Sequence, residues 1–366
     1  MRNRLSTLVS AGVVLGVAGA ALADDIKVSA GLEYNYSYNF NKPGSRSNTF
    51  LFNGRDSDFS INRTEFSISK APSASGKAGF HVCYIDGQAG DVLKALTGGT
   101  SNFAEAYGIV TGTFGDRDLS VEAGQFKSLF GVEKIQAGDF YSRSFSFQLL
   151  QPILGKGVRA ALTLDEDTTL TGYIQNGLSN VDNSNKDLAF GVQYGRKLGE
   201  DSSVRVNLAT GREPVVLNQP DLAQAGVNRS SSIANVVYTR AFGEDTSFAL
   251  DGTIRFGRDA SDNDTDTTGI AAYLTRKLGN GGAFAVRGEY LSQSSATAGL
   301  LPSGAGNVKP NLTSITFAYH LPGGSDASRT IIEYRYDRSN GFVFEKEANS
   351  LKKDQGTLTI GQVFRF

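Results

Sequence analysis

The sequence predicts an all-β fold, a transmembrane antiparallel β-barrel of about 16 strands (range about 14–18) with short periplasmic turns and long external loops. Three observations carry this prediction. Apolar and polar residues alternate along most of the chain, as they do on strands that have two different faces. Many of these segments are about ten residues long, the length that a tilted strand needs to cross a bilayer. Their connections alternate between short and long, which a soluble β-sandwich has no reason to do.

The first 23 residues have the features of a secretory signal peptide. Arg2 and Arg4 form a basic start, residues 8–20 are apolar, and Ala21-Leu22-Ala23 supplies the small-x-small cleavage pattern. The alternative is an N-terminal membrane anchor, but the apolar run is shorter than the roughly 20 residues that span a bilayer. We therefore expect a signal peptide at 1–23 and one barrel domain at 24–366, located in the outer membrane of a diderm bacterium after cleavage.

The alternation begins with the first mature residues and continues to the last ones. From 26 to 38 one parity is apolar and aromatic while the other is polar or Gly. In the last segment Leu358, Ile360, Phe364 and Phe366 share one parity, and Thr357, Thr359, Gly361 and Arg365 share the other. Residues 91–96 are the one place beyond the signal where helical spacing is conceivable, and they lie in a loop. The expected strands begin near Ile26, Asp58, Lys77, Phe103, Leu119, Gly157, Thr168, Lys186, Ser203, Ser232, Thr246, Thr267, Ala283, Asn311, Ser328 and Gly356.

The connections keep one phase along the chain. Starting after the second expected strand, every other connection is a tight turn rich in Gly, Asn and Asp, residues that tolerate positive φ. These turns are 72–75, 115–118, 165–167, 199–202, 243–245, 279–282 and 322–325. The intervening connections are longer and polar, for example 41–55, 213–229, 292–309 and 340–355. Outer-membrane barrels show this asymmetry, with the short turns in the periplasm.

Composition excludes several other classes. Near-neutral charge (36 basic and 37 acidic residues) gives no case for nucleic-acid binding, and one Cys cannot build a disulfide framework. His81 and His320 are the only histidines, so we expect no metal site, no cofactor and no catalytic site. The acidic stretch 259–266 lacks the Gly and terminal Glu of an EF-hand and is interpreted as a solvated loop.

One long connection, residues 127–154, differs from the others because it is rich in aromatic residues. A fully solvated loop has no reason to carry them. One interpretation is that this third external loop folds into the lumen and narrows a pore. The alternative is that it extends the external wall of the barrel. Under the first interpretation the constriction residues are Lys127, Glu133, Lys134, Asp139 and Arg143.

Charged residues at the inward parity are expected to line a water-filled lumen. This parity is forced, because a charge on the lipid face would cost about 2–4 kcal/mol at mid-bilayer. Mixed signs could orient solutes in a transverse field, or could merely form a salt-bridged interior without selectivity. Neighbouring pairs such as Arg63 with Glu65 are expected to neutralise each other. The set is Glu33, Arg63, Glu65, Glu122, Arg159, Arg205, Asp251, Arg255, Arg287, Glu289, Glu333 and Arg335.

The C-terminus carries a pattern that is similar to the assembly signal of outer-membrane barrels. Thr359 is followed by Gly361, Phe364 and Phe366, giving polar-x-Gly-x-x-aromatic-x-aromatic at the carboxylate. We expect Gly361, Phe364 and Phe366 to be recognised by the barrel assembly machinery.

Local motifs between about 105 and 185 resemble a known family. They are Gly124-Gln125-Phe126-Lys127, Phe130-Gly131-Val132-Glu133, Tyr141-Ser142-Arg143-Ser144 with Pro152, Ala106-Tyr107 and Asn176-Gly177. They resemble the OmpL-like family of β-barrel outer-membrane porins, with local similarity to phosphate-selective porins. Leu178 stands where the family often has Trp, and the mixed charges of 127–143 depart from a phosphate channel's basic run.

The resemblance implies a passive channel for small hydrophilic solutes or ions in outer-membrane lipid. The alternative is a structural or adhesive outer-membrane barrel without channel activity. By analogy with general porins, we expect a homotrimer.

Overall fold

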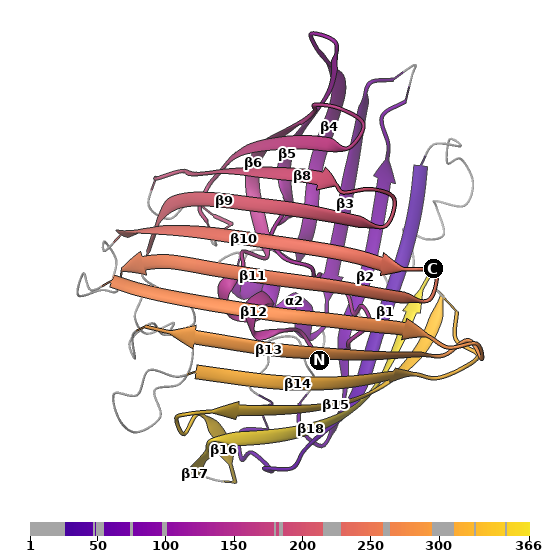
Figure 1. Ribbon diagram of the computed structural model, residues 1–366, viewed down its shortest axis with the longest axis vertical. Helices are drawn as coiled ribbons and strands as arrows, with labels where there is room; N and C mark the ends of the chain where they lie inside the picture. The colour runs from indigo at the N-terminus through magenta and orange to yellow at the C-terminus, as the bar shows by residue number, and fades with distance from the viewer. Residues whose placement is uncertain are drawn as a thin grey trace, which may run out of the picture.

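The computed structural model forms one closed antiparallel barrel (Figure 1). It describes residues 26–46, 48, 55–73, 76–96, 101–178, 181–182, 186–214, 228–258, 264–294, 311–325, 327–347 and 350–366. The expected signal peptide therefore lies outside the described residues. The first half of the wall consists of β1 (Ile26–Asn39), β2 (Asp58–Lys70), β3 (Ala78–Asp86), β4 (Phe103–Phe114), β5 (Arg117–Lys127), β6 (Leu154–Thr163), β7 (Thr168–Gln175) and β8 (Ala189–Lys197).

The second half continues in the same up-and-down order, and the last strand closes the barrel against the first. It consists of β9 (Ser202–Pro214), β10 (Asn228–Phe242), β11 (Thr246–Arg258), β12 (Asp264–Lys277), β13 (Ala283–Gln293), β14 (Asn311–His320), β15 (Ser328–Ser339) and β18 (Asp354–Arg365). The expected fold class and the count of 16 strands are confirmed. The predicted strand starts differ from the observed ones by at most four residues, at Ser232 against Asn228.

The alternation sorts side chains onto two faces. On β13, Phe284 and Tyr290 point outward and each is 42% exposed, whereas Arg287 and Leu291 point inward and are fully buried. Large apolar side chains on the outside suit a surface that contacts lipid. The short turns are tight, and Gly243 and Gly323 adopt the positive φ values of 67° and 83° that such turns require.

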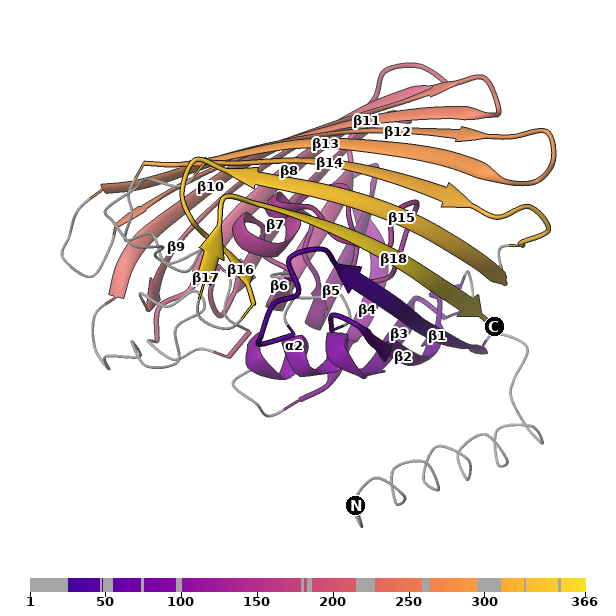
Figure 2. The same cartoon turned by 90° about the horizontal axis from the view of Figure 1, so that it is seen from below.

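Two of the long connections contain elements of their own (Figure 2). The second long connection along the chain contains α2 (Gln88–Leu96), which includes the segment 91–96 where helical spacing was conceivable. The last long connection contains the hairpin β16 (Phe344–Lys346) and β17 (Ser350–Lys352). This hairpin contacts the first long loop, because the backbone N–H of Glu347 donates to the carbonyls of Asn41 and Lys42. Among the described residues, no helix is long and apolar enough to cross a membrane.

Candidate functional site

The connection between β5 and β6, residues 128–153 and called loop 3 below, lies inside the barrel rather than extending its wall. Tyr141 and Leu150 are fully buried, and Phe145 is 2% exposed. The loop ends in η1, a π-helical turn over Ser146–Leu150, whose side chains are mostly buried. Of the two interpretations of the loop's position, the structure therefore shows the folded-in one.

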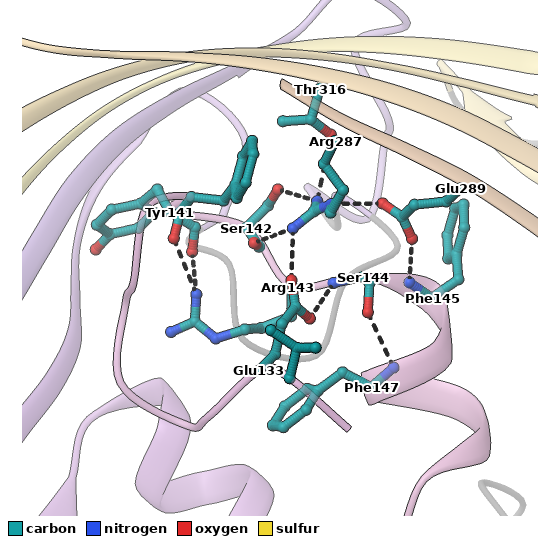
Figure 3. A network of polar contacts seen from close by, with 12 residues as sticks. Glu133, Tyr141, Ser142, Arg143, Ser144, Phe145, Phe147, Arg287, Glu289 and Thr316 are labelled. Carbon is teal, nitrogen blue, oxygen red and sulfur yellow. Dashed lines mark hydrogen bonds and ion pairs between the residues drawn. The ribbon is translucent and has the colours of Figure 1, made fainter. Parts of the chain in front are cut away.

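Irregular backbone inside a barrel must find hydrogen-bond partners, because an unpaired buried N–H or C=O costs about 1–3 kcal/mol. Carboxylates on the inward face of the wall accept bonds from the N–H groups of loop 3 (Figure 3). These bonds run from Ala137 to Glu33 (2.7 Å), from Val132 to Asp251 (3.0 Å), from Phe145 to Glu289 (2.6 Å), and from Tyr141 and Ser142 to Glu333 (2.7 and 3.0 Å).

Arginines of the wall satisfy the carbonyl oxygens of the loop in the complementary way. The guanidinium of Arg287 donates to the carbonyl of Ser142 and pairs with Glu133, both at 2.8 Å (Figure 3). Further donations run from Arg335 to Arg143 (2.7 Å), from Arg205 to Gly131 (3.1 Å), and from Arg329 and Arg365 to Ala137 (2.9 and 2.7 Å). Wall charges of both signs thus hold one loop by its backbone.

Apolar contacts complete the seat of loop 3. Phe140 and Tyr141 pack against small or branched residues at inward positions of six wall strands. These residues are Ala249, Ala271, Ala285, Ala318, Ile331 and Val363. Two other elements also contact loop 3. Phe145 and Leu150 pack with Phe344 of the β16–β17 hairpin. Ile135 and Phe147 pack with Leu93 of α2. The outer side of loop 3 is therefore covered by protein within the described residues.

Two glycines make room for this packing. A Cβ at Gly361 of β18 would overlap the ring of Tyr141, and one at Gly269 of β12 would overlap Ser146 and Leu150 of η1. Both glycines occupy inward positions of regular strands. Gly361, which was expected to belong to an assembly signal, thus makes room for the ring of Tyr141.

Two of the five expected constriction residues face open space. Lys134 is exposed and Asp139 is half-buried. Both border a cavity of about 620 Å³ on the turn side of loop 3, together with Thr275, Arg329 and Arg365. The carboxylate of Asp139 accepts a bond from Thr275 at 2.8 Å. The cavity wall on the far side is formed by β10, β11 and β12.

The charged groups of the other three expected constriction residues form contacts with protein atoms, and two of the three, Glu133 and Arg143, also line the cavity. Glu133 forms the ion pair with Arg287, and Lys127 forms one with Glu105 at 2.7 Å. Arg143 is 2% exposed, and its guanidinium donates to four carbonyl oxygens of loop 3 itself. Arg143 therefore organises the loop from inside, which differs from the expected role of a charge facing solute.

The inward charges also differ from the expected water-lined set. The structure places six of them in buried positions: Arg63, Asp251, Arg287, Glu289, Glu333 and Arg335. Glu33 is likewise buried, whereas Glu65, Glu122, Arg159, Arg205 and Arg255 are half-buried.

The expected pairing of neighbouring charges is found at Arg63 with Glu65 and at Arg287 with Glu289. For the pair Glu333 and Arg335 the partners differ. Glu333 accepts the two loop N–H groups, and Arg335 pairs with Asp337 at 2.8 Å.

Sequence reasoning missed the residues that seat the loop, namely Tyr141, the inward alanines and Gly269. A signal for them was present. Water-facing positions of a barrel have no need to be Ala, so a row of Ala at the inward parity of β11 to β14 indicates an apolar partner inside. Recognising that partner as loop 3 requires the strand registers.

A closed 16-stranded barrel with a long loop folded into its lumen is the architecture of a class of proteins, the outer-membrane porins, which are channels. More particularly, the chain belongs to the family described as "Putative beta-barrel porin-2, OmpL-like", which residues 25–366 match. The predicted family and channel function are confirmed by this match. No curated protein matches the sequence.

Solved structures share the fold at low sequence identity. The chain is similar to the anion-selective porin from Comamonas acidovorans (TM-score 0.64, 11% identity, 93% of this chain and 99% of that one). It is also similar to the trimer form of OmpT from Vibrio cholerae (TM-score 0.63, 11% identity, 93% of this chain and 99% of that one). A third similar structure is that of the outer-membrane channel DcaP of Acinetobacter baumannii (TM-score 0.61, 11% identity, 93% of this chain and 97% of that one).

Proposed function

We propose that this porin is a passive diffusion channel for small hydrophilic solutes or ions, and that the solute path passes loop 3 beside Lys134 and Asp139. The observation that carries the proposal is the cavity of about 620 Å³ between loop 3 and the wall strands β10 to β12. Opposite charges on Lys134 and Asp139 at its edge would order polar solutes by charge. Of the five residues first assigned to the constriction, these two are the ones we retain as solute contacts.

Planar-bilayer recording of the folded chain tests the channel proposal. We expect stepwise ion currents from single insertions. Absence of such steps from correctly folded protein would favour the alternative, a structural or adhesive barrel. One observation favours this alternative: α2 and the β16–β17 hairpin pack against loop 3, and a covered loop leaves less room for solute to pass.

The reversal potential across a salt gradient tests the path itself. Lys134→Glu should move the reversal potential toward cation preference, because a fixed charge next to the path changes sign. Arg117→Glu is the matched control, since Arg117 is the exposed first residue of β5 and does not line the cavity. Equal shifts in the two variants would contradict the proposed path.

Three further proposals concern assembly. We propose that the signal at 1–23 is cleaved and that Gly361, Phe364 and Phe366 are recognised by the barrel assembly machinery; N-terminal sequencing and crosslinking test these. We also propose a homotrimer in outer-membrane lipid, in line with the trimer form described for OmpT. Sedimentation in detergent, with the detergent density matched, distinguishes a trimer from a monomer.

A further inference from the structure

A histidine, a cysteine and a glutamate meet on the inward face of β3 and β4. His81 and Cys83 share this face because they are two residues apart on one strand, and Glu105 is the direct cross-strand neighbour of Cys83. The Nε2 atom of His81 lies 3.3 Å from the nearer carboxylate oxygen of Glu105. One nitrogen, one sulfur and one oxygen donor of this trio all lie within 4.8 Å of one another.

We propose that His81, Cys83 and Glu105 form a binding site for a divalent transition-metal ion, with Zn²⁺ as the best-matched one. Imidazole, thiolate and carboxylate are the donors that Zn²⁺ takes, at bond lengths of about 2.0–2.3 Å. Three protein donors would leave one coordination position open to water or solute. A soft sulfur donor beside an imidazole disfavours Ca²⁺ and Mg²⁺, which prefer oxygen ligands alone.

The sheet fixes the spacing of the three donors. Neighbouring strands hold Cys83 and Glu105 opposite each other, and the strand repeat fixes His81 relative to Cys83. Donors around a tetrahedral ion are about 3.3–3.8 Å apart, as follows from the bond lengths above. The distance between His81 and Glu105 already falls in this range, so small side-chain rotations would suffice for Cys83.

Two features of the structure affect metal binding: the route by which an ion reaches Cys83, and the nearby ammonium group of Lys127. Cys83 is 1% exposed among apolar neighbours that include Ile85 and Ala104, so an ion would enter past His81, whose side chain is 24% exposed. The ammonium of Lys127 lies 2.7 Å from the same Glu105 oxygen that faces His81. Lys127 therefore holds a cationic charge where the ion would bind, and it competes with the ion.

The charge balance follows from these contacts. On binding, the Cys83 thiol releases its proton to solvent and its sulfur becomes a thiolate ligand. Lys127 keeps its proton and leaves Glu105 for the lumen, where its side chain is already 28% exposed. Thiolate and carboxylate then neutralise the two charges of the ion, and the lumen gains one unpaired ammonium.

Titration of the folded full chain in detergent with Co²⁺ tests the site, because Co²⁺ reports a thiolate ligand through a charge-transfer absorption band. We expect one ion per chain with this band, displaced by Zn²⁺. Cys83→Ser should abolish the band, and His81→Gln should weaken affinity by at least about tenfold. His320→Gln is the matched control, since His320 binds the carbonyl of Asp139 in another part of the lumen, at 2.8 Å.

Lys127→Met tests the proposed metal site while leaving its three donor residues in place. Removing the competing ammonium should raise Co²⁺ affinity by about tenfold or more if the ion and Lys127 share Glu105. The proposal is overturned if neither the wild type nor Lys127→Met gives the thiolate band, or if His320→Gln weakens binding as much as His81→Gln does. Unheated gel mobility, which separates folded barrels from unfolded chains, verifies that each variant is folded.

Discussion

On β12 and β13, several outward-facing side chains are large, apolar and exposed, whereas several of their inward-facing neighbours are small or charged. Ile270 and Phe284 point outward and are 44% and 42% exposed. Ala271, Ala285 and Arg287 point inward and are at most 1% exposed. An outward face in lipid can carry any apolar shape, while the inward face contacts loop 3, which needs space and hydrogen-bond partners. The inward face of this wall is therefore built in large part around a segment of its own chain.

The largest expected effect, on single-channel conductance, comes from removing loop 3, which the inward face contacts. Replacing residues 130–151 by a short Gly-Ser linker should leave the barrel able to form, because its hydrogen bonds run between neighbouring wall strands. Single-channel conductance should rise several-fold, since the loop fills the middle of the lumen. Replacing 344–352 instead should change conductance less, because that hairpin lies at the outer mouth. Equal conductance in wild type and the 130–151 variant would refute loop 3 as the obstruction.

A charge on the outward face should carry the next largest cost. Ile270→Arg places a guanidinium in lipid near the middle of β12, and we expect a loss of about 2–4 kcal/mol in the free energy of unfolding. Asp245→Arg, on an exposed periplasmic turn, is the matched control and should be nearly neutral. Urea unfolding of the barrel in lipid vesicles measures both, and a similar loss for the two would show that the outward face is not in lipid.

Removing a partner on the inward face should loosen the loop rather than the barrel. Glu333→Leu deletes the acceptor for the N–H groups of Tyr141 and Ser142, at a cost of about 1.5–3 kcal/mol to the docking of loop 3. Hydrogen exchange at these two amides should accelerate accordingly. Glu200→Leu, at an exposed turn position, should leave their exchange unchanged. Unaltered protection in Glu333→Leu would mean that the wall carboxylate does not hold the loop.

The smallest expected effect comes from one methyl group placed on either face. Gly361→Ala would overlap Tyr141 on the inward face and should cost about 1–3 kcal/mol. Gly288→Ala faces outward on β13, where a Cβ meets open space, so it should cost almost nothing. The unfolding measurement above applies to both. If Tyr141→Ala relieved none of the cost of Gly361→Ala, the clash would not be its cause.

Sequence reasoning predicted the wall well because wall strands obey a local rule. Alternation and turn composition depend on nearby residues, so strand starts such as Ile26 and Thr246 coincide with the observed ones. The aromatic content of 127–154 also indicated a loop that avoids solvent. The role of Glu333 could not be predicted, because the N–H groups that it accepts, those of Tyr141 and Ser142, lie 192 and 191 residues away in the chain.

The sequence by itself determined the class of this protein: a period-two pattern with alternating short and long connections leaves a membrane barrel as the consistent solution. Only the tertiary structure decided what the inward residues do. An inward arginine has the same parity whether it faces water, a solute or a backbone carbonyl. The choice among these depends on whether loop 3 enters the lumen, and that depends on long-range contacts such as the close approach of the Tyr141 ring to Gly361.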